Sequence, residues 1–310
     1  MSYARRDRWI AFAMLLPSII LIAIFVYGFI GWTTLVSLSQ WDGVKPNYAW
    51  AGLDTYMQLF SREGGVSAKR FNIDLWNTFF FTLFFLLLCV GLGLLLAVFL
   101  DQKIKGEGIF RTIYLFPMSL SFVVTGVVWQ WIFAPGTPTR LRGVNALFDL
   151  AGLDALKWKW YTSTDSIGPF HLALIPVIIA AAWQLTGYTM AMYLAGLRGI
   201  PEELREAARV DGATEVGIYR HIILPMLQPI TLSALIVLGH ISLKIFDLVY
   251  TMTGKGSGFV TDVPGIFMFE TTFQGNHYSM GAAISIIMLL MVAVVIVPYL
   301  IYSLRREVEL

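Results

Sequence analysis

The chain has 310 residues, of which 57% are hydrophobic and only 14% are charged, and its mean hydropathy is +0.70. Soluble domains are nearer half apolar and a quarter charged, so the composition excludes a protein with a sizeable soluble part. The net charge is only +2, and no basic patch is interleaved with aromatic residues, so no nucleic-acid partner is predicted.

Six apolar runs follow one another along the chain, each with the ~20 or more residues that a helix needs to cross a bilayer. They are residues 9–35, 75–100, 113–133, 171–197, 226–251 and 279–303. A spanning segment must satisfy its own backbone hydrogen bonds, so each run is predicted to be a helix. The sequence therefore predicts an all-α, polytopic membrane protein in contact with lipid, with six transmembrane helices in a single domain over residues 1–310.

Basic residues are denser in the loops on one side of these spans. Twelve lie in the two termini, the second-to-third turn and the fourth-to-fifth loop: Arg5, Arg6, Arg8, Lys103, Lys105, Arg111, Arg198, Arg205, Arg209, Arg220, Arg305 and Arg306. The other loops hold nine in roughly twice the length. Because the denser side faces the cytoplasm, both termini and the 198–225 loop are predicted to be cytoplasmic.

Residues that carry chemistry are scarce. Cys89 is the only cysteine and lies within an apolar run, so it is predicted to be buried and inert. The four histidines are scattered, and no phosphate-binding loop is present. We therefore predict no catalytic residue, no metal site and no ATP site in this chain.

The loop at residues 200–225 is unusually polar for a turn between two spans. Pro201 suits the first position of a short helix, with two glutamates following in the first turn. Gly212 can adopt the backbone angles that end a helix, and Asp211 can cap the helix that follows. The loop is therefore predicted to be two short helices that meet at Gly212. An apolar stripe is predicted on the first of them, at Ile200, Leu204, Ala207 and Ala208.

By pattern alone, an amphipathic helix lying on the membrane is an equally good interpretation. The residues nevertheless resemble the EAA motif of permease subunits in binding-protein-dependent ABC importers. The match consists of Glu206-Ala207-Ala208, Gly212, Ile222 and Leu224-Pro225. The fuller run, EAARVDGAT…HIILPMLQP, is similar to the maltose-transporter type of carbohydrate-uptake permease, and the similarity extends over residues 183–256.

This resemblance implies a type I ABC importer permease fold in a prokaryotic cell membrane, and a mono- or oligosaccharide as substrate. The chain itself would be non-catalytic and hold no cofactor. ATP and Mg would be bound by two cytoplasmic ATP-binding subunits. The other implied partners are a second homologous permease subunit, forming a heterodimer with this one, and an extracytoplasmic sugar-binding protein.

The resemblance also makes the 200–225 loop a coupling helix that docks in a cleft of the ATPase subunit. It implies a polar contact for Glu206 and close packing for Ala207 and Ala208 at that interface. Gly212 would form the elbow, and Asp211 also falls within the motif.

Polar residues inside the fourth and fifth spans are candidate substrate ligands, because such residues are costly in a bilayer and usually face an interior. Lys244 and Asp247 are three residues apart, so they are predicted to share a helix face and to pair. The candidate set is Gln184, Tyr188, His240, Ser242, Lys244 and Asp247. It offers hydrogen-bond donors, acceptors and an aromatic face, as a neutral sugar requires, and the resemblance implies a substrate cavity near these positions. A purely structural polar cluster is the alternative.

Two other classes of protein remain open. In an ion-coupled secondary transporter of a small polar solute, Lys244 and Asp247 would form the coupling site. Such folds show paired halves with interrupted spans, which the sequence does not reveal. A membrane-embedded enzyme needs a nucleophile, a base or metal ligands in one constellation, and the sequence offers none.

Overall fold

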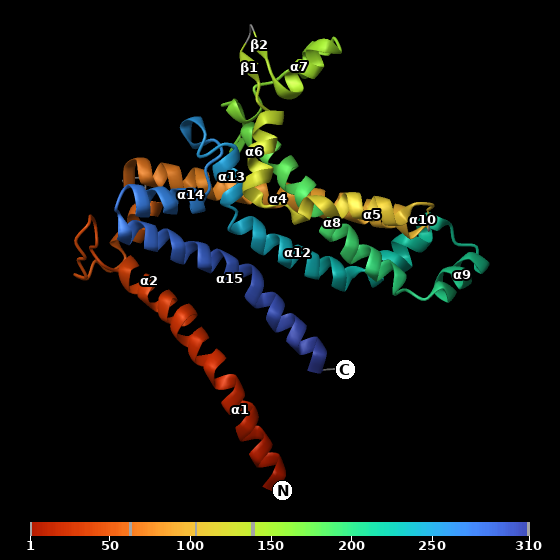
Figure 1. Ribbon diagram of the computed structural model, residues 1–310, viewed down its shortest axis with the longest axis horizontal. Coiled ribbons are helices and arrows are strands. Elements are labelled where there is room, and N and C mark those ends of the chain that lie inside the picture. The colour runs from red at the N-terminus through yellow and green to blue at the C-terminus, as the bar shows by residue number, and fades with distance from the viewer. Residues whose placement is uncertain (1, 62–63, 103, 138–139, 309–310) are drawn as a thin grey trace. The chain divides into compact units, whose positions relative to one another are not determined.

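The computed structural model describes the backbone of residues 2–61, 64–102, 104–137 and 140–308, and the side chains of these ranges between residues 10 and 301. Figure 1 labels the helices and strands. Some residues of the predicted charge distribution lie outside this description: Lys103, and the side chains of Arg5, Arg6, Arg8, Arg305 and Arg306.

By their contacts the residues form two compact units, Met1–Lys69 with Phe267–Leu290 and Arg70–Ile266 with Met291–Leu310. Three helices have residues in both units: α4 (Gly65–Asp101), α14 (Pro264–Phe269) and α15 (Tyr278–Val308). Because these helices are shared, the division does not test the predicted single domain.

The first unit opens with a long apolar helical segment. Its elements are α1 (Ser2–Ile22), the π-helical turn η1 (Ala23–Gly28), α2 (Phe29–Ser37), α3 (Asp54–Phe60) and the π-helical turn η9 (Glu270–Gln274). Ile10–Ser37 is long and apolar enough to span a membrane, and none of its most apolar window is buried within the chain. A helix satisfies its own backbone, so such a segment is stable in a bilayer without packing against its own chain.

The second unit is built around α8 (Ile175–Arg198), whose most apolar window is 72% buried. The other helices here are α5 (Glu107–Leu115), η3 (Phe116–Ser119), α6 (Phe122–Ile132), α7 (Gly143–Leu150), η4 (Asp154–Leu156), η5 (Trp160–Thr162), η6 (Leu172–Leu174), α9 (Glu202–Val210), α10 (Glu215–Ile218), η7 (Tyr219–Ile223), α11 (Leu224–Met226), α12 (Gln228–Leu243), α13 (Asp247–Met252) and η8 (Ser257–Phe259). α8 packs against α5, α6, α12 and α13, and Figure 1 shows α12 running beside it.

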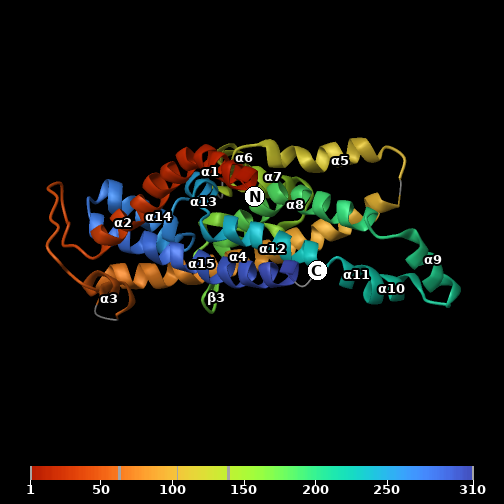
Figure 2. The ribbon, with the colours of Figure 1, turned by 90° about the horizontal axis from the view of Figure 1, so that it is seen from below.

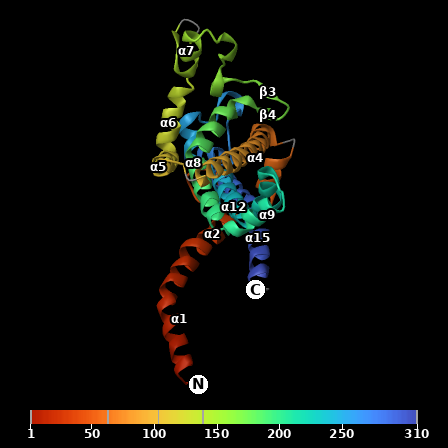
Figure 3. The same ribbon diagram turned by 90° about the vertical axis from the view of Figure 1, so that its right-hand side faces the viewer.

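Two short hairpins lie between α6 and α8. Antiparallel strands β1 (Gly136–Thr137) and β2 (Arg140–Leu141) form the first, and β3 (Ser166–Ile167) and β4 (Phe170–His171) form the second. Within this unit, α7 lies at the far end of α6 from α4 and α8 (Figure 3). At another end, α9 lies beyond the ends of α8 and α4 (Figure 2).

Four of the six predicted spans are single helices of membrane length. Their bounds are Ile10–Ser37, Gly65–Asp101, Leu172–Arg198 and Tyr278–Ile301. The third and fifth predicted spans are bent pairs of helices instead, so six straight crossings would be the wrong description of the chain.

The third predicted span breaks between η3 and α6, and its two halves are bent by 101°. Pro117 lies in η3 and has no N–H to continue the helical ladder. Leu120 is extended, with φ −81° and ψ 149°. The Ser121 hydroxyl then accepts a hydrogen bond from the Val124 N–H (3.2 Å) and caps α6.

The fifth predicted span is interrupted at both ends. The helical segment Glu215–Met226 meets α12 at 61°. α12 then ends at Leu243, because Lys244 (φ −116°, ψ 21°) and Phe246 (φ −130°, ψ −60°) leave helical geometry before α13 begins. α13 packs against α6, where a Cβ on Gly126 would come within 2.0 Å of Thr251 Oγ1. Only glycine therefore permits this close approach.

Two buried apolar clusters hold the second unit together. The first joins α4 to α8, α12 and α13, and it contains Cys89. The predicted burial of Cys89 is confirmed, and its thiol is free. The second cluster joins the ends of α4 and α8 to Ile218 and Ile223, so it reaches the polar loop that follows α8.

A buried ion pair attaches the loop after α13 to α4. Arg70 Nε lies 2.5 Å from Asp262 Oδ2, and the two side chains are 10% and 0% exposed. The Asn77 amide donates to the backbone carbonyls of Phe259 (3.1 Å) and Asp262 (3.0 Å). Asn77 Oδ1 also lies 2.9 Å from His171 Nδ1. The network therefore joins the start of α4, the loop and the entry to α8.

Asp262→Ala is expected to destabilise the protein, because it removes the carboxylate beside the buried Arg70 guanidinium. Loss of one partner of a buried ion pair costs about 3–5 kcal/mol, and the Tm of the purified protein in detergent reports this loss. Glu107→Ala is the control, since it removes the partly exposed partner of Arg198 (2.7 Å) and should cost less than about 1 kcal/mol. Equal losses of Tm in the two variants would contradict the structural role given to Asp262.

Candidate functional site

The polar loop after α8 consists of two short helices, as the sequence predicts. α9 begins at Glu202, so Pro201 occupies the N-cap and not the first helical position predicted for it. At the other end, Gly212 has φ +81°, and its N–H donates to the Arg209 carbonyl (3.0 Å). The Ala213 N–H donates to the Ala208 carbonyl (2.9 Å). These two bonds form a Schellman motif, so the predicted turn at Gly212 is confirmed.

The second helix, α10, is capped by a residue that the sequence argument missed. The Thr214 hydroxyl accepts a hydrogen bond from the Gly217 N–H (3.2 Å). Asp211 is instead the C-cap residue of α9. The prediction that Asp211 caps the following helix is therefore wrong. Thr214 directly precedes Glu215, and a hydroxyl followed by an acidic first turn is the pattern that identifies this cap.

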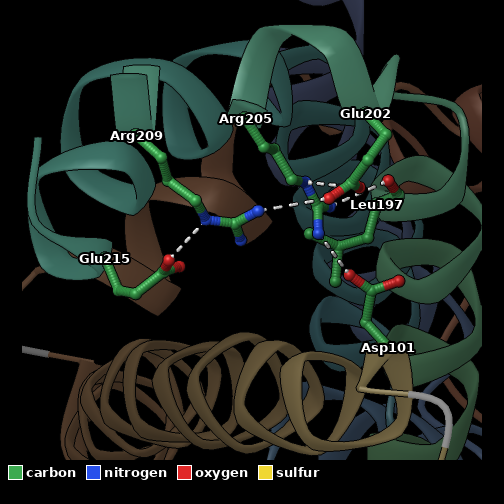
Figure 4. Close-up of polar contacts among 6 residues, drawn as sticks. All are labelled: Asp101, Leu197, Glu202, Arg205, Arg209 and Glu215. Atoms are coloured by element: carbon green, nitrogen blue, oxygen red, sulfur yellow. Dashed lines mark hydrogen bonds and ion pairs between the residues drawn. The ribbon is translucent and has the colours of Figure 1, made fainter. Parts of the chain in front are cut away.

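Arg205 joins α9 to the rest of the second unit (Figure 4). Its Nη1 lies 3.0 Å from Asp101 Oδ2 at the end of α4, and its Nη2 donates to the Leu197 carbonyl near the end of α8 (3.2 Å). The Arg205 and Asp101 side chains are only 13% and 10% exposed. A charge-assisted bond between partly buried groups is stronger than a surface pair, so this contact fixes α9 against two membrane-length helices.

Arg209 makes the solvent-exposed ion pairs of the loop. Its Nε lies 2.7 Å from Glu215 Oε1, and its Nη1 lies 3.5 Å from Glu202 Oε1. The hydrogen bond from Arg209 lowers the pKa of the Glu215 carboxyl. Because these side chains are largely exposed, the contacts hold α9 and α10 together but add little stability.

The EAA residues divide between two faces of α9. Ala208 is half-buried against the cluster at the ends of α4 and α8, whereas Glu206 and Ala207 are exposed. Val210 and Val216 are 88% and 78% exposed. Ala207 is therefore the more accessible of the two alanines, and packing of either alanine against a partner stays a prediction.

The predicted apolar stripe does not form one face either. Ile200 is buried and Ala208 is half-buried, while Leu204 and Ala207 are exposed. Arg205 takes the inward position of this turn because Asp101 and the Leu197 carbonyl lie beneath it. From the sequence, Arg205 is predicted only to be one of the cytoplasmic charges.

Gln184 has a structural partner. It is 2% exposed, and its Nε2 donates to the Leu120 carbonyl (2.7 Å), at the break between η3 and α6. Its Oε1 is buried and has no hydrogen-bond partner within the described residues. Tyr188, one turn further along α8, is half-buried against the first apolar cluster.

The fifth-span candidates do not gather around one point. Lys244 and Asp247 are both exposed, and no ion pair joins them in the described part of the chain. The prediction that they share a face and pair is wrong, because helix α12 ends before Lys244 and three-residue spacing has no helical meaning there. Ser242 is buried and donates to the Gly239 carbonyl (2.8 Å), and His240 is half-buried. Substrate binding by any of the six candidates stays a prediction.

An apolar cavity of about 540 Å³ lies beside α8, between α4, α5 and α6. Trp129 and Trp183 both line it, and their rings meet edge to face with centroids 5.6 Å apart. No cluster of three or more potential metal ligands is found where the structure describes the chain.

The family match and the named relatives all describe membrane components of transport systems. Residues 89–308 match the family described as "Binding-protein-dependent transport system inner membrane component". A probable ABC transporter permease protein of Pyrococcus horikoshii is 42% identical over 293 residues, covering 94% of this chain and 95% of the relative. The xylose/arabinose import permease protein of Haloferax volcanii is 35% identical, with 93% and 86% covered. The trehalose/maltose transport system permease protein MalF of Thermococcus litoralis is 28% identical, with 95% and 94% covered.

Among solved structures, a chain of a bacterial ABC transporter involved in the import of the acidic polysaccharide alginate superposes with a TM-score of 0.78. The two chains are 24% identical, and the match covers 98% of each. Similarity over almost the whole length establishes a common fold, so the predicted all-α importer permease fold is confirmed.

Arg205→Ala is expected to loosen α9, because it removes both contacts with the ends of α4 and α8. Backbone amides at 202–213 should then exchange hydrogen at least about tenfold faster, since loss of roughly 1.4 kcal/mol of local stability corresponds to that factor. Arg209→Ala is the control, because its partners are exposed, and it should leave α9 exchange nearly unchanged. Identical exchange in Arg205→Ala and the unmodified chain would contradict the role given to Arg205.

Proposed function

The chain belongs to the family of inner membrane components of binding-protein-dependent transport systems, and from this we propose that it is the permease subunit of an ATP-driven sugar importer. The names of the Haloferax and Thermococcus relatives support a neutral pentose or disaccharide as the class of substrate. Sugar would be delivered by an extracytoplasmic binding protein. This chain would pair with a second, homologous permease subunit and with two cytoplasmic ATP-binding subunits, which would hold ATP and Mg.

The exposed face of α9 carries this proposal. Glu206, Ala207 and Val210 lie at helical spacing on that face and are exposed, while Arg205 holds the opposite face on α4 and α8. Exposed apolar side chains next to a small residue suit a partner that approaches closely. A partner seated on this face would move two spanning helices when it moves α9, as coupling to an ATPase requires.

Transport would follow from this attachment. Closure of the ATP-binding subunits would shift the coupling loop, and the shift would change which side of the membrane the substrate path opens to. Hydrolysis would then restore the starting arrangement. The chain's own contribution is mechanical, through α9 and the helix ends beneath it, and chemistry on ATP belongs to the partner. Both termini and this loop would face the cytoplasm.

The secondary-transporter alternative has lost its main support. It depended on a coupling site made by Lys244 and Asp247, and these residues do not pair. The break after α12 does resemble the interrupted spans of such carriers. The break alone does not separate the two classes, but family membership favours the ATP-driven importer.

Ala207→Arg is expected to reduce sugar uptake strongly while leaving the fold intact. Ala207 is exposed, so a bulky cation there disturbs only a partner, and a clash worth about 1.4 kcal/mol weakens binding tenfold. Co-purification of the ATP-binding subunits should fall with uptake. Ala207→Ser is the matched control and should retain both. Normal uptake by the arginine variant would contradict docking on this face.

Gly212→Val should also impair uptake, for a different reason. Gly212 has φ +81°, and a left-handed conformation costs a non-glycine residue roughly 1–2 kcal/mol. Membrane insertion should be normal, while ATP hydrolysis should lose its dependence on sugar. Gly212→Asn is the control, because asparagine tolerates this conformation. Coupled transport at the normal rate in the valine variant would count against an elbow that must keep its shape.

A further inference from the structure

A polar cavity of about 560 Å³ lies in the first unit, and it shares no lining residue with the candidate site described above. Its walls come from the segment after α2, from α3 and the start of α4, and from the segment between η9 and α15. The volume is within the 300–1,000 Å³ or so that small-molecule sites occupy.

Backbone pairing makes one wall of this cavity. The Ser279 N–H donates to the Trp41 carbonyl (3.0 Å), and the Gly43 N–H donates to the Asn276 carbonyl (2.8 Å). Ser279 lines the polar cavity, whereas the rings of Trp41 and Tyr278, with centroids 4.9 Å apart, pack together beside a neighbouring cavity. The wall is therefore held by hydrogen bonds and by aromatic packing.

The lining groups are hydrogen-bonding and, in part, acidic. Asp54 and Gln58 lie one turn apart on α3 and both line the cavity. In the described residues, neither side chain makes a hydrogen bond or an ion pair, so both are available to a ligand. On the opposite wall, Asp42 is paired with His277. Among the described residues, the lining contains two carboxylates and no lysine or arginine.

We infer that this cavity binds a neutral saccharide. The inference rests on the proposed function and deepens it, because it assigns a binding site to that neutral sugar. Sugar hydroxyls can donate to the Asp54 carboxylate and accept from the Gln58 amide. The Asp54 carboxylate, which has no cationic partner among the described residues, repels an anionic sugar such as a uronate. A divalent cation fits less well, because Asp42 is already engaged and no group of three acidic or histidine ligands occurs among the described side chains.

The predicted orientation puts this site on the extracytoplasmic side. The segment between α2 and α4 and the segment before α15 connect spans opposite the termini. A sugar delivered from outside would therefore meet this cavity before it enters the membrane.

Thiol protection tests the site directly. The chain's only cysteine, Cys89, is buried, so Gln58→Cys supplies a single accessible thiol facing the cavity. Met57→Cys is the matched control, because Met57 is 59% exposed on the same helix and does not line the cavity. The assembled transporter in sealed vesicles is labelled from outside with membrane-impermeant thiosulfonates, with and without xylose, maltose or trehalose at high millimolar concentration.

The expected result is at least about threefold slower labelling of Gln58→Cys with one of these sugars, and no change at Met57→Cys; such a factor corresponds to a mostly occupied site. Glucuronate should give no protection. Labelling unchanged by all three neutral sugars, or slowed equally at both positions, would overturn the inference. Protection by glucuronate as strong as by neutral sugar would overturn the charge class.

Reagent charge provides a second readout that needs no sugar. A cationic thiosulfonate should react faster than an anionic one at Gln58→Cys, relative to the same ratio at Met57→Cys. Asp54→Asn, added to each variant, should reduce the preference at position 58 only. An unchanged ratio would remove the electrostatic argument.

These outcomes are separable from failure of the proposed function. Absent protection combined with the expected loss of uptake in Ala207→Arg would remove the cavity site alone. Labelling of both cysteines only from the cytoplasmic side would reverse the predicted orientation, and the importer proposal would fall with it.

Discussion

The bond between Arg205 and the ends of two spanning helices is the constraint on which the functional argument depends. A short helix in an aqueous loop has little stability of its own. Forming its first turn costs conformational entropy, and its few hydrogen bonds do not offset that cost. α9 keeps its position since Arg205 reaches Asp101 on α4 and the Leu197 carbonyl on α8 at the same time. With that face fixed, the opposite face, including Ala207, is presented in a defined direction.

Local rules predicted the local features well. Gly212 was predictable because few other residues accept its positive φ, and the burial of Cys89 followed from its place in an apolar run. The predictions failed where a competing backbone or side-chain partner decided the outcome. Thr214 caps α10 in place of Asp211, and Arg205 takes an inward position on α9 because Asp101 and the Leu197 carbonyl accept hydrogen bonds from it.

The bent spans mark the limit of hydropathy as a guide. A run of apolar residues predicts that a segment lies in the membrane, but not that it is straight. Each break releases backbone groups that water cannot reach, so a neighbouring side chain must satisfy them. Gln184 does so for the Leu120 carbonyl, and for this reason a residue that resembled a substrate ligand is first a structural one. Lys244 and Asp247 were misjudged for the same reason, because the helix that would have aligned them ends at Leu243.

These contacts converge on α8. Near its cytoplasmic end in the predicted orientation, the Leu197 carbonyl accepts from Arg205 of α9. The hydroxyl of Tyr193 donates to Thr231 of α12 (2.9 Å), and Gln184, about 20 Å from Leu197 at 1.5 Å per residue, holds the break before α6. In the proposed function, a displacement of α9 would therefore reach both interrupted spans through the buried helix α8. Bent helices can change angle at their breaks without losing hydrogen bonds elsewhere, whereas straight ones cannot. The breaks before α6 and at the ends of α12, which hydropathy does not predict, are thus the places where the helices would bend most easily during a coupling motion.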